Sequence, residues 1–238
     1  MKHLMPIALV AFAPIAALAQ DRSDEEIKQL ALDAILERPE ILMEAIQLLD
    51  QREAEAQQSS IARVLEDERE LLEDDPNAPV MGNPEGDAVV VEFFDYNCPY
   101  CKRVAPDVEA LIEGDDEVKV VYREWPILGE GSVFAARAAL AAREQDLYAP
   151  FHWALMDLAG RATEDTVIKT AEEVGLDVER LRADMEAPEI DAHIETSMRL
   201  ASALGFNGTP SFVIGDALVP GLVPLERLQD LVEEARAE

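Results

Sequence analysis

The feature that most constrains the fold is the segment Cys98-Pro99-Tyr100-Cys101, which contains both cysteines of the 238-residue chain. It follows an apolar run over residues 89–94, typical of a buried strand, and precedes a helical pattern over residues 102–112. A strand that ends where C-x-x-C opens a helix is typical of a redox-active dithiol. We therefore expect an α/β fold with a dithiol at the start of a helix.

The spacing of the two cysteines has a chemical reason. Two sulfurs three residues apart on a helix can meet across one turn, and Cys98 would face the positive end of the helix dipole as an exposed nucleophile of lowered pKa. Pro99 suits the first turn, where a missing N–H costs nothing. Two other interpretations stay open: half of a zinc site, for which His152 and His193 are the remaining candidates, and a structural disulfide, which would constrain little chain.

The first residues of the chain predict export. Residues 4–18 are apolar, and Ala17-Leu18-Ala19 matches a cleavage site, so residues 1–19 are predicted to be a secretory signal peptide. No later stretch reaches the ~20 apolar residues that a membrane-spanning helix needs. We expect a periplasmic protein without membrane insertion, because a redox-active cysteine pair suits an oxidising compartment.

The charge of the chain excludes some partners. The sequence contains 50 acidic and 20 basic residues, which give a formal net charge of −30. Such a surface repels the phosphates of nucleic acids and of anionic membranes. No nucleic-acid partner is therefore expected.

An N-terminal appendage precedes the redox domain. Residues 23–26 match a capping box that starts one helix, and a second helical pattern runs over about 40–73. Its middle, residues 51–60, is almost wholly polar, so this helix cannot bury itself along its whole length against one domain. We predict that residues 20–75 form a helical oligomerisation region with a linker helix, in which 24–49 pack against copies of the chain. Helices that fold back on the redox domain are the alternative.

The rest of the chain predicts one α/β domain. Turn residues over 76–87 indicate a linker, and the domain is expected over residues 88–238. Its elements are expected in the order strand, helix, parallel strand, helical insertion, hairpin and helix, over residues 88–95, 98–112, 118–122, about 130–188, 211–219 and 225–235.

This order of elements, with Cys98-Pro99-Tyr100-Cys101 followed at a distance by Thr209-Pro210, resembles the DsbA family of thioredoxin-fold thiol:disulfide oxidoreductases. The resemblance covers residues 87–238 and implies a thioredoxin fold with a helical insertion, the two cysteines as catalytic residues and no cofactor. It also implies a cis Pro210 beside them, with substrate contacts from Thr209, Pro210, Pro99 and Tyr100. Glutaredoxins can carry the same tetrapeptide, but they lack the insertion.

The appendage narrows the resemblance. Residues 37–45, Glu-Arg-Pro-Glu-Ile-Leu-Met-Glu-Ala, are similar to the N-terminal region of suppressor-of-copper-sensitivity C proteins. That group implies an oligomeric, often trimeric, disulfide isomerase acting on misoxidised proteins. Cys98 would attack a substrate disulfide and Cys101 would resolve the mixed disulfide. An isomerase also needs an electron donor, such as a membrane thiol reductase of the DsbD type.

Two other functions remain open. A monomeric DsbA-like dithiol oxidase would use the same two sulfurs. A copper-binding or copper-tolerance module is also conceivable, because thiolates suit Cu(I). However, Met156, Met185 and Met198 are scattered over helical faces and predicted to lie in the core, so no metal site is expected.

Two titratable residues of the redox domain are also of interest. His152 stands in an aromatic helical segment, and we predict that it packs there instead of transferring protons. Glu92, by the alternation of its strand, can lie beneath the cysteines and accept a proton.

Overall fold

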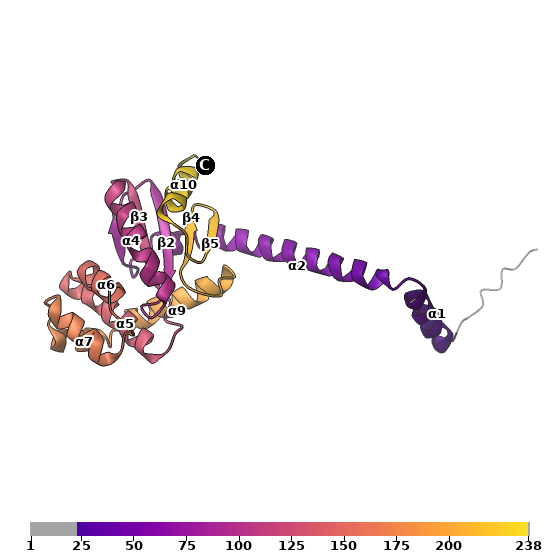
Figure 1. Ribbon diagram of the computed structural model, residues 1–238, viewed down its shortest axis with the longest axis horizontal. Helices are drawn as coiled ribbons and strands as arrows, with labels where there is room; N and C mark the ends of the chain where they lie inside the picture. Colours follow the sequence, from indigo (N-terminus) through magenta and orange to yellow (C-terminus); the bar gives the residue numbers. More distant parts are fainter. Residues whose placement is uncertain (1–22, 238) are drawn as a thin grey trace, which may run out of the picture. The chain divides into compact units, whose positions relative to one another are not determined.

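The structure, a computed structural model, describes residues 23–237 (Figure 1). The predicted signal peptide, residues 1–19, lies outside the described residues. The chain divides into two compact units after Glu55. None of the described helices is both long and apolar enough to cross a membrane.

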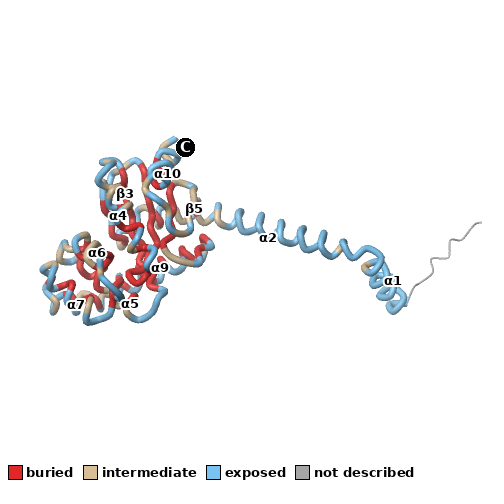
Figure 2. The backbone as a smooth tube through the Cα atoms, in the orientation of Figure 1, coloured by how far each residue is buried: buried red, intermediate tan, exposed pale blue. Residues whose placement is uncertain are grey.

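The first unit contains helix α1 (Asp24–Glu37) and the beginning of α2 (Glu40–Asp67). The predicted capping box opens α1: the Ser23 hydroxyl accepts the backbone N–H of Glu26, whose carboxylate accepts the N–H of Ser23 at 2.9 Å. No residue of α1 is buried, and Figure 2 shows exposure along α1 and most of α2. Large exposed apolar side chains in this unit are Ile27, Leu30, Leu32, Leu36, Leu42, Met43, Ile46, Leu48 and Leu49.

The second unit is built on a five-stranded sheet in the order β1-β3-β2-β4-β5. Its strands are β1 (Val80–Gly82), β2 (Ala88–Phe94), β3 (Val118–Glu124), β4 (Ser211–Ile214) and β5 (Ala217–Pro220). Strands β2 and β3 are parallel, and the other pairs are antiparallel. Helix α4 (Pro99–Gly114) connects the parallel pair. The predicted mixed α/β fold is confirmed.

The helical insertion follows β3. It comprises α5 (Glu130–Ala141), a 3-10 turn at Ala142–Gln145, α6 (Tyr148–Met156), α7 (Glu164–Glu173) and α8 (Val178–Asp184), and the long α9 (Pro188–Ala203) follows it. Figure 1 shows α5, α6 and α7 as a group of helices beside the sheet. Buried alanines of α5 lie at the centre of this group, where small side chains allow close helix packing: Ala135, Ala136, Ala138, Ala139 and Ala141.

Helices cover both faces of the sheet because side chains alternate along each strand. Val90 and Phe94 of β2 belong to the core that contains residues of α4 and of α10 (Leu225–Arg236). Val91 and Phe93 belong to a second core, formed with α9, α3 (Arg69–Glu73) and the end of α2. By the same alternation, Glu92 lies on the face of β2 that α4 covers.

Residues 76–87, which were predicted to be a linker, already contribute a strand to the sheet. That segment contains β1, an edge strand too short to show in the sequence pattern, and both Ala78 and Met81 are buried. The compact unit starts at Ala56, well inside the predicted oligomerisation region. The end of α2 therefore belongs to the redox unit.

A buried ion pair holds α3 against the sheet. Arg123 Nη1 lies 2.6 Å from Asp75 Oδ2, and both side chains are buried. Burial alone would raise the pKa of Asp75, but the hydrogen bonds from Arg123 and from the Asn77 N–H lower it. Removing one partner would leave an uncompensated buried charge.

The prediction for the methionines is correct for Met156 and Met185, which are buried, and wrong for Met198, which is 48% exposed. The buried stripe of α9 runs through Ile190, Ile194 and Ser197. Met198 falls beside that stripe, on the outer face of the helix.

We expect Leu72→Ala to lower the free energy of unfolding by about 2–5 kcal/mol, because Leu72 is buried in the second core and its truncation leaves a cavity. Urea denaturation measures the effect. Leu222→Ala is the matched control, since Leu222 is 41% exposed, and it should change stability by less than about 0.5 kcal/mol. Equal effects of the two changes would contradict the packing of α3.

Candidate active site

The turn between β2 and α4 positions the first cysteine. Cys98 is the N-cap residue of α4, Pro99 follows in the first turn, and the Cys98 N–H donates to the Asp95 carbonyl at 2.9 Å. The Asp95 side chain accepts the N–H groups of Asn97 at 2.7 Å and of Leu128 at 2.9 Å. Asp95 thus shapes this turn and ties it to the loop after β3. An Asp placed two residues before the N–H that it accepts is a known turn signal, and our sequence analysis missed it.

Asn97 fastens the same turn to the helical insertion. Its side-chain amide donates to the Ser132 hydroxyl at 3.0 Å and to the Ala162 carbonyl at 3.2 Å, and it accepts the Ala162 N–H at 2.7 Å. Gly131 is necessary at this close approach, because a Cβ there would collide with the Ala162 carbonyl. Nothing in the local sequence predicts these contacts.

The two cysteines are free thiols, and Cys98 meets Thr209-Pro210, as the resemblance implied. The Thr209-Pro210 peptide bond is cis, and Cys98 Sγ lies 3.1 Å from the Thr209 carbonyl oxygen. Cys101 is fully buried, and Cys98 is only 4% exposed. The expectation of an exposed nucleophile is therefore wrong for the free protein, because a distant segment packs against the sulfur.

The two thiols have opposite pKa shifts. A hydrogen bond from the Cys101 thiol is the main cause that lowers the pKa of Cys98 to about 5, and further hydrogen bonds come from the Thr209 side chain and the N–H groups of Cys101 and Tyr100. Burial of Cys98 opposes this shift. Burial, followed by the hydrogen bond to Cys98, raises the pKa of Cys101 far above its ordinary value. At neutral pH the site therefore holds one thiolate and one thiol.

Glu92 lies close enough to the dithiol for its charge to act on the thiols, in agreement with the prediction from strand alternation. Burial, and then the negative charge of Cys98, raise the pKa of Glu92 to about 8. Its Oε1 has no hydrogen-bond partner among the described residues. The Glu92 carboxyl is thus mostly protonated at neutral pH and can exchange a proton with a nearby group.

His152 is a packed residue, as predicted. Its Nδ1 lies 3.0 Å from the Tyr96 hydroxyl, and its ring packs against those of Phe94, Tyr122 and Trp153. Burial lowers the pKa of His152 to about 3, so the ring is neutral at physiological pH.

The described residues contain no group of three or more potential metal ligands. His193, the other candidate ligand for zinc, is buried, and its Nε2 lies 2.7 Å from Glu124 Oε2. The Glu124 carboxylate also accepts the Tyr148 hydroxyl at 2.7 Å. This buried cluster was missed because its members come from three separate elements.

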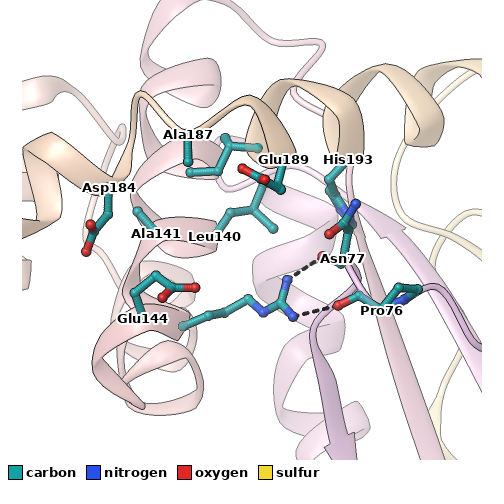
Figure 3. Close-up of a pocket in the computed structure, with 11 residues that line it drawn as sticks. Pro76, Asn77, Leu140, Ala141, Glu144, Asp184, Ala187, Glu189 and His193 are labelled. Carbon is teal, nitrogen blue, oxygen red and sulfur yellow. Dashed lines mark hydrogen bonds between the residues drawn. The ribbon is translucent and has the colours of Figure 1, made fainter.

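A cavity of about 510 Å³ lies apart from the dithiol (Figure 3). Its lining comes from the end of α5, the α8–α9 connection and the Pro76-Asn77 turn, and includes no residue of the segment from Asp95 to Cys101. Arg143, one of the lining residues, donates to the carbonyls of Asn77 and Pro76 at 2.5 and 2.8 Å. These bonds connect the insertion to the start of the sheet.

Comparisons with known proteins agree with this geometry. The family model of the DSBA-like thioredoxin domain matches residues 89–233. A thioredoxin-like oxidoreductase from Silicibacter pomeroyi DSS-3 is 64% identical, with a TM-score of 0.71 over 71% of this chain and 98% of that one. ScsC from Proteus mirabilis, in a transitional conformation, is 30% identical, with a TM-score of 0.68 over 90% of this chain and 94% of that one.

A periplasmic thioredoxin-like protein from Salmonella enterica serovar Typhimurium is 32% identical, with a TM-score of 0.62 over 71% of this chain and 96% of that one. The curated relatives that match first are Na(+)/H(+) antiporters named NhaA, among them one from Herminiimonas arsenicoxydans. This chain spans about a quarter of their length.

We expect alkylation of reduced Cys98 by iodoacetamide to have its midpoint near pH 5, because hydrogen bonds stabilise the thiolate. Cys101→Ala removes the main donor and should raise this midpoint. Mass spectrometry of alkylated peptides over pH 4–9 measures both, with Cys98→Ser as the blank. A wild-type midpoint above pH 7 would contradict the assignment.

Between pH 5 and 8, Glu92 and Cys98 should change the stability of the reduced protein in opposite directions. The pKa of Glu92 is about 8 when folded against 4.5 ordinarily, so the folded state binds the extra proton and stability falls as pH rises. The pKa of Cys98 is about 5 against 9.0, so the unfolded state binds the extra proton and stability rises.

Glu92→Gln should therefore leave a rise of stability with pH, and Cys98→Ser should leave a fall of about 1 kcal/mol per pH unit. Urea denaturation of the reduced proteins at three pH values measures both slopes. If the stability of both variants changed with pH in the same direction, the opposite effects of Glu92 and Cys98 would be disproved.

Proposed function

The chain belongs to the family of DSBA-like thioredoxin domains and is a thiol-disulfide oxidoreductase with a C-x-x-C active site, and on that premise we propose that it is an oligomeric disulfide isomerase or reductase. The proposal rests above all on one observation: the large apolar side chains of residues 24–49 are exposed. An apolar face of this extent is typical of an interaction surface. Self-association through it, with a trimer favoured by the resemblance, would bring several dithiols to one substrate.

In the proposed mechanism, the Cys98 thiolate attacks one sulfur of a substrate disulfide. A bond forms between Cys98 and that sulfur, the substrate S–S bond breaks, and the other substrate sulfur leaves as a thiolate. Isomerisation follows when the released thiolate attacks another substrate disulfide. A substrate thiolate then attacks the mixed disulfide and releases Cys98 as a thiolate.

Cys101 serves as the resolving thiol when the substrate rearranges too slowly. Glu92 in its carboxylate form takes the Cys101 proton, and the Cys101 thiolate attacks Cys98 Sγ. The Cys98–Cys101 disulfide forms and the substrate leaves reduced. The enzyme then needs two electrons from a donor, which we propose is a membrane thiol reductase of the DsbD type.

The residues beside the dithiol are suited to an extended substrate segment. Tyr100 is 51% exposed, and the Thr209 backbone lies next to Cys98. We infer that the substrate aligns along Thr209 and Pro210 as an added strand and contacts Pro99 and Tyr100. The signal-peptide pattern at residues 1–19 supports a periplasmic location for this reaction.

A second function, a dithiol oxidase, is favoured by the lowered pKa of Cys98. A stabilised thiolate favours the reduced form of the pair and makes its disulfide more oxidising. Thiol trapping in cells separates the two functions, because an isomerase is kept reduced and an oxidase is kept oxidised.

In a refolding assay with scrambled ribonuclease, we expect the protein without its predicted signal peptide to restore ribonuclease activity. The Cys98→Ser variant should not restore it. Ile46→Glu places a charge on the exposed apolar face of α2 and should reduce both oligomer mass and isomerase rate at least several-fold. Gln47→Glu, one residue on, is the matched control and should change neither. Light scattering during chromatography measures the mass, and a monomeric wild-type protein would refute the proposed assembly.

A further inference from the structure

Basic side chains without carboxylate partners gather at the dithiol. Most lysines and arginines of residues 56–237 form ion pairs, as expected where 50 acidic residues accompany 20 basic ones. Five of these basic residues have no described carboxylate within 4.0 Å: Arg63 and Arg143, which lie away from the dithiol, and Lys102, Arg103 and Arg161, whose segments adjoin it. In a chain so rich in carboxylates, unpaired cations at one place indicate charge that is available to a partner.

Arg103 is held at the dithiol by an aromatic ring. Its guanidinium carbon lies 4.8 Å from the centre of the Tyr100 ring, a cation–π distance. Arg103 is exposed, and Tyr100 lies inside the C-x-x-C motif itself. The charge is therefore positioned beside the sulfur-bearing turn and stays open to solvent.

Arg161 reaches the same edge from the insertion. Its Nη2 donates to the Leu128 carbonyl at 2.8 Å, and it directly precedes Ala162, which is hydrogen-bonded to Asn97, the residue before Cys98. Lys102 lies deeper: its ammonium donates to the carbonyls of Leu158 and Gly160 at 2.6 and 3.1 Å. Lys102 thus fastens the loop before Arg161, while Arg161 itself is exposed.

Apolar side chains complete this surface. Ile127 is 39% exposed and Leu128 is 38% exposed, on the loop that Arg161 and Asp95 hold. We call Tyr100, Arg103, Ile127, Leu128 and Arg161 the active-site rim. The rim combines two cations with three apolar groups beside a nucleophilic sulfur.

We propose that the active-site rim selects substrate segments that carry carboxylates next to the cysteine to be exchanged. This inference deepens the proposed function and rests on it. An acidic segment can pair with Arg103 and Arg161, while its apolar atoms contact Tyr100, Ile127 and Leu128.

Because salt shortens the range of electrostatic forces, the rim cations can favour an acidic segment although the protein as a whole is acidic. At physiological ionic strength the Debye length is about 8 Å, so most of the negative surface is screened from a bound segment and the adjacent cations are not. Nearby acidic residues are Asp95, which accepts the Leu128 N–H, Asp107, one helical turn after Arg103, Glu130, and Asp157, which acts at a distance on Lys102. None of them forms an ion pair within 4.0 Å with a rim cation.

The test uses three peptides, identical except that the residues flanking a single cysteine are Glu, Gln or Lys. Each cysteine carries a disulfide-linked thionitrobenzoate. The Cys98 thiolate attacks the peptide sulfur, a Cys98–peptide disulfide forms, and the coloured thionitrobenzoate anion leaves. Stopped-flow absorbance gives the rate for each peptide.

For the reduced wild-type protein we expect the Glu peptide to react roughly three- to tenfold faster than the Lys peptide at low salt. The ratio should fall towards one in about 0.5 M salt. The double variant Arg103→Gln/Arg161→Gln should lower the low-salt ratio at least twofold, and Arg103→Gln alone should lower it partly. Because the readout is a ratio, a general loss of exchange chemistry divides out.

Arg63→Gln is the matched control, since Arg63 is an exposed arginine on α2 whose described hydrogen bond is to the Ser59 carbonyl. It should leave the ratio unchanged. An unchanged ratio in the rim double variant would overturn the proposal, as would an equal slowing of all three peptides, which would assign the cations to thiolate stabilisation. If the ratios behave as expected but scrambled ribonuclease is not restored, the proposed isomerase function fails and the rim selectivity stands.

Discussion

Every chemical property of the site depends on the hydrogen bonds that converge on the Cys98 sulfur at the start of α4. Donors from Cys101, the Thr209 side chain and the first turn of the helix overcome the cost of burying a charge there. Cys101 and Glu92, which lie deeper, are kept protonated mainly by their burial. One charged and two neutral groups in a small volume give the exchange its order: attack by Cys98 first, then proton transfer and resolution.

The hydrogen bonds from Cys101 and from the first turn are local, whereas the Thr209 contact and the shape of the turn depend on distant segments fastened to it. Asp95 binds the loop after β3, and Asn97 binds the insertion at Ala162. The Thr209 carbonyl contacts Cys98 Sγ from the segment before β4, and β4 pairs with the edge of β2 opposite to β3. The same fastening places Arg161 near the dithiol, so the fold that lowers the pKa of Cys98 also supplies the charge of the active-site rim.

Sequence patterns predicted the features that depend on a short, regular pattern of residues, such as strand alternation and a capping box. The alternation along β2 placed Glu92 on the face of α4, and the capping box at Ser23 predicted the start of α1. The same methods failed where an element is short or lies at the edge of a stripe. Three residues of β1 carry no recognisable period, and Met198 lies one position outside the buried stripe of α9.

The sequence by itself determined that a dithiol begins a helix after a buried strand and that a hairpin follows Thr209-Pro210, since these features depend on neighbours within a few residues. Only the tertiary structure decided which groups surround the sulfur. Cys98 and Thr209 are 111 residues apart, and Asn97 and Ala162 are 65 apart. The main hydrogen bond to Cys98 comes from Cys101 within the same motif, but the burial of Cys98 and its contact with Thr209 come from such distant segments, and no local pattern contains that information.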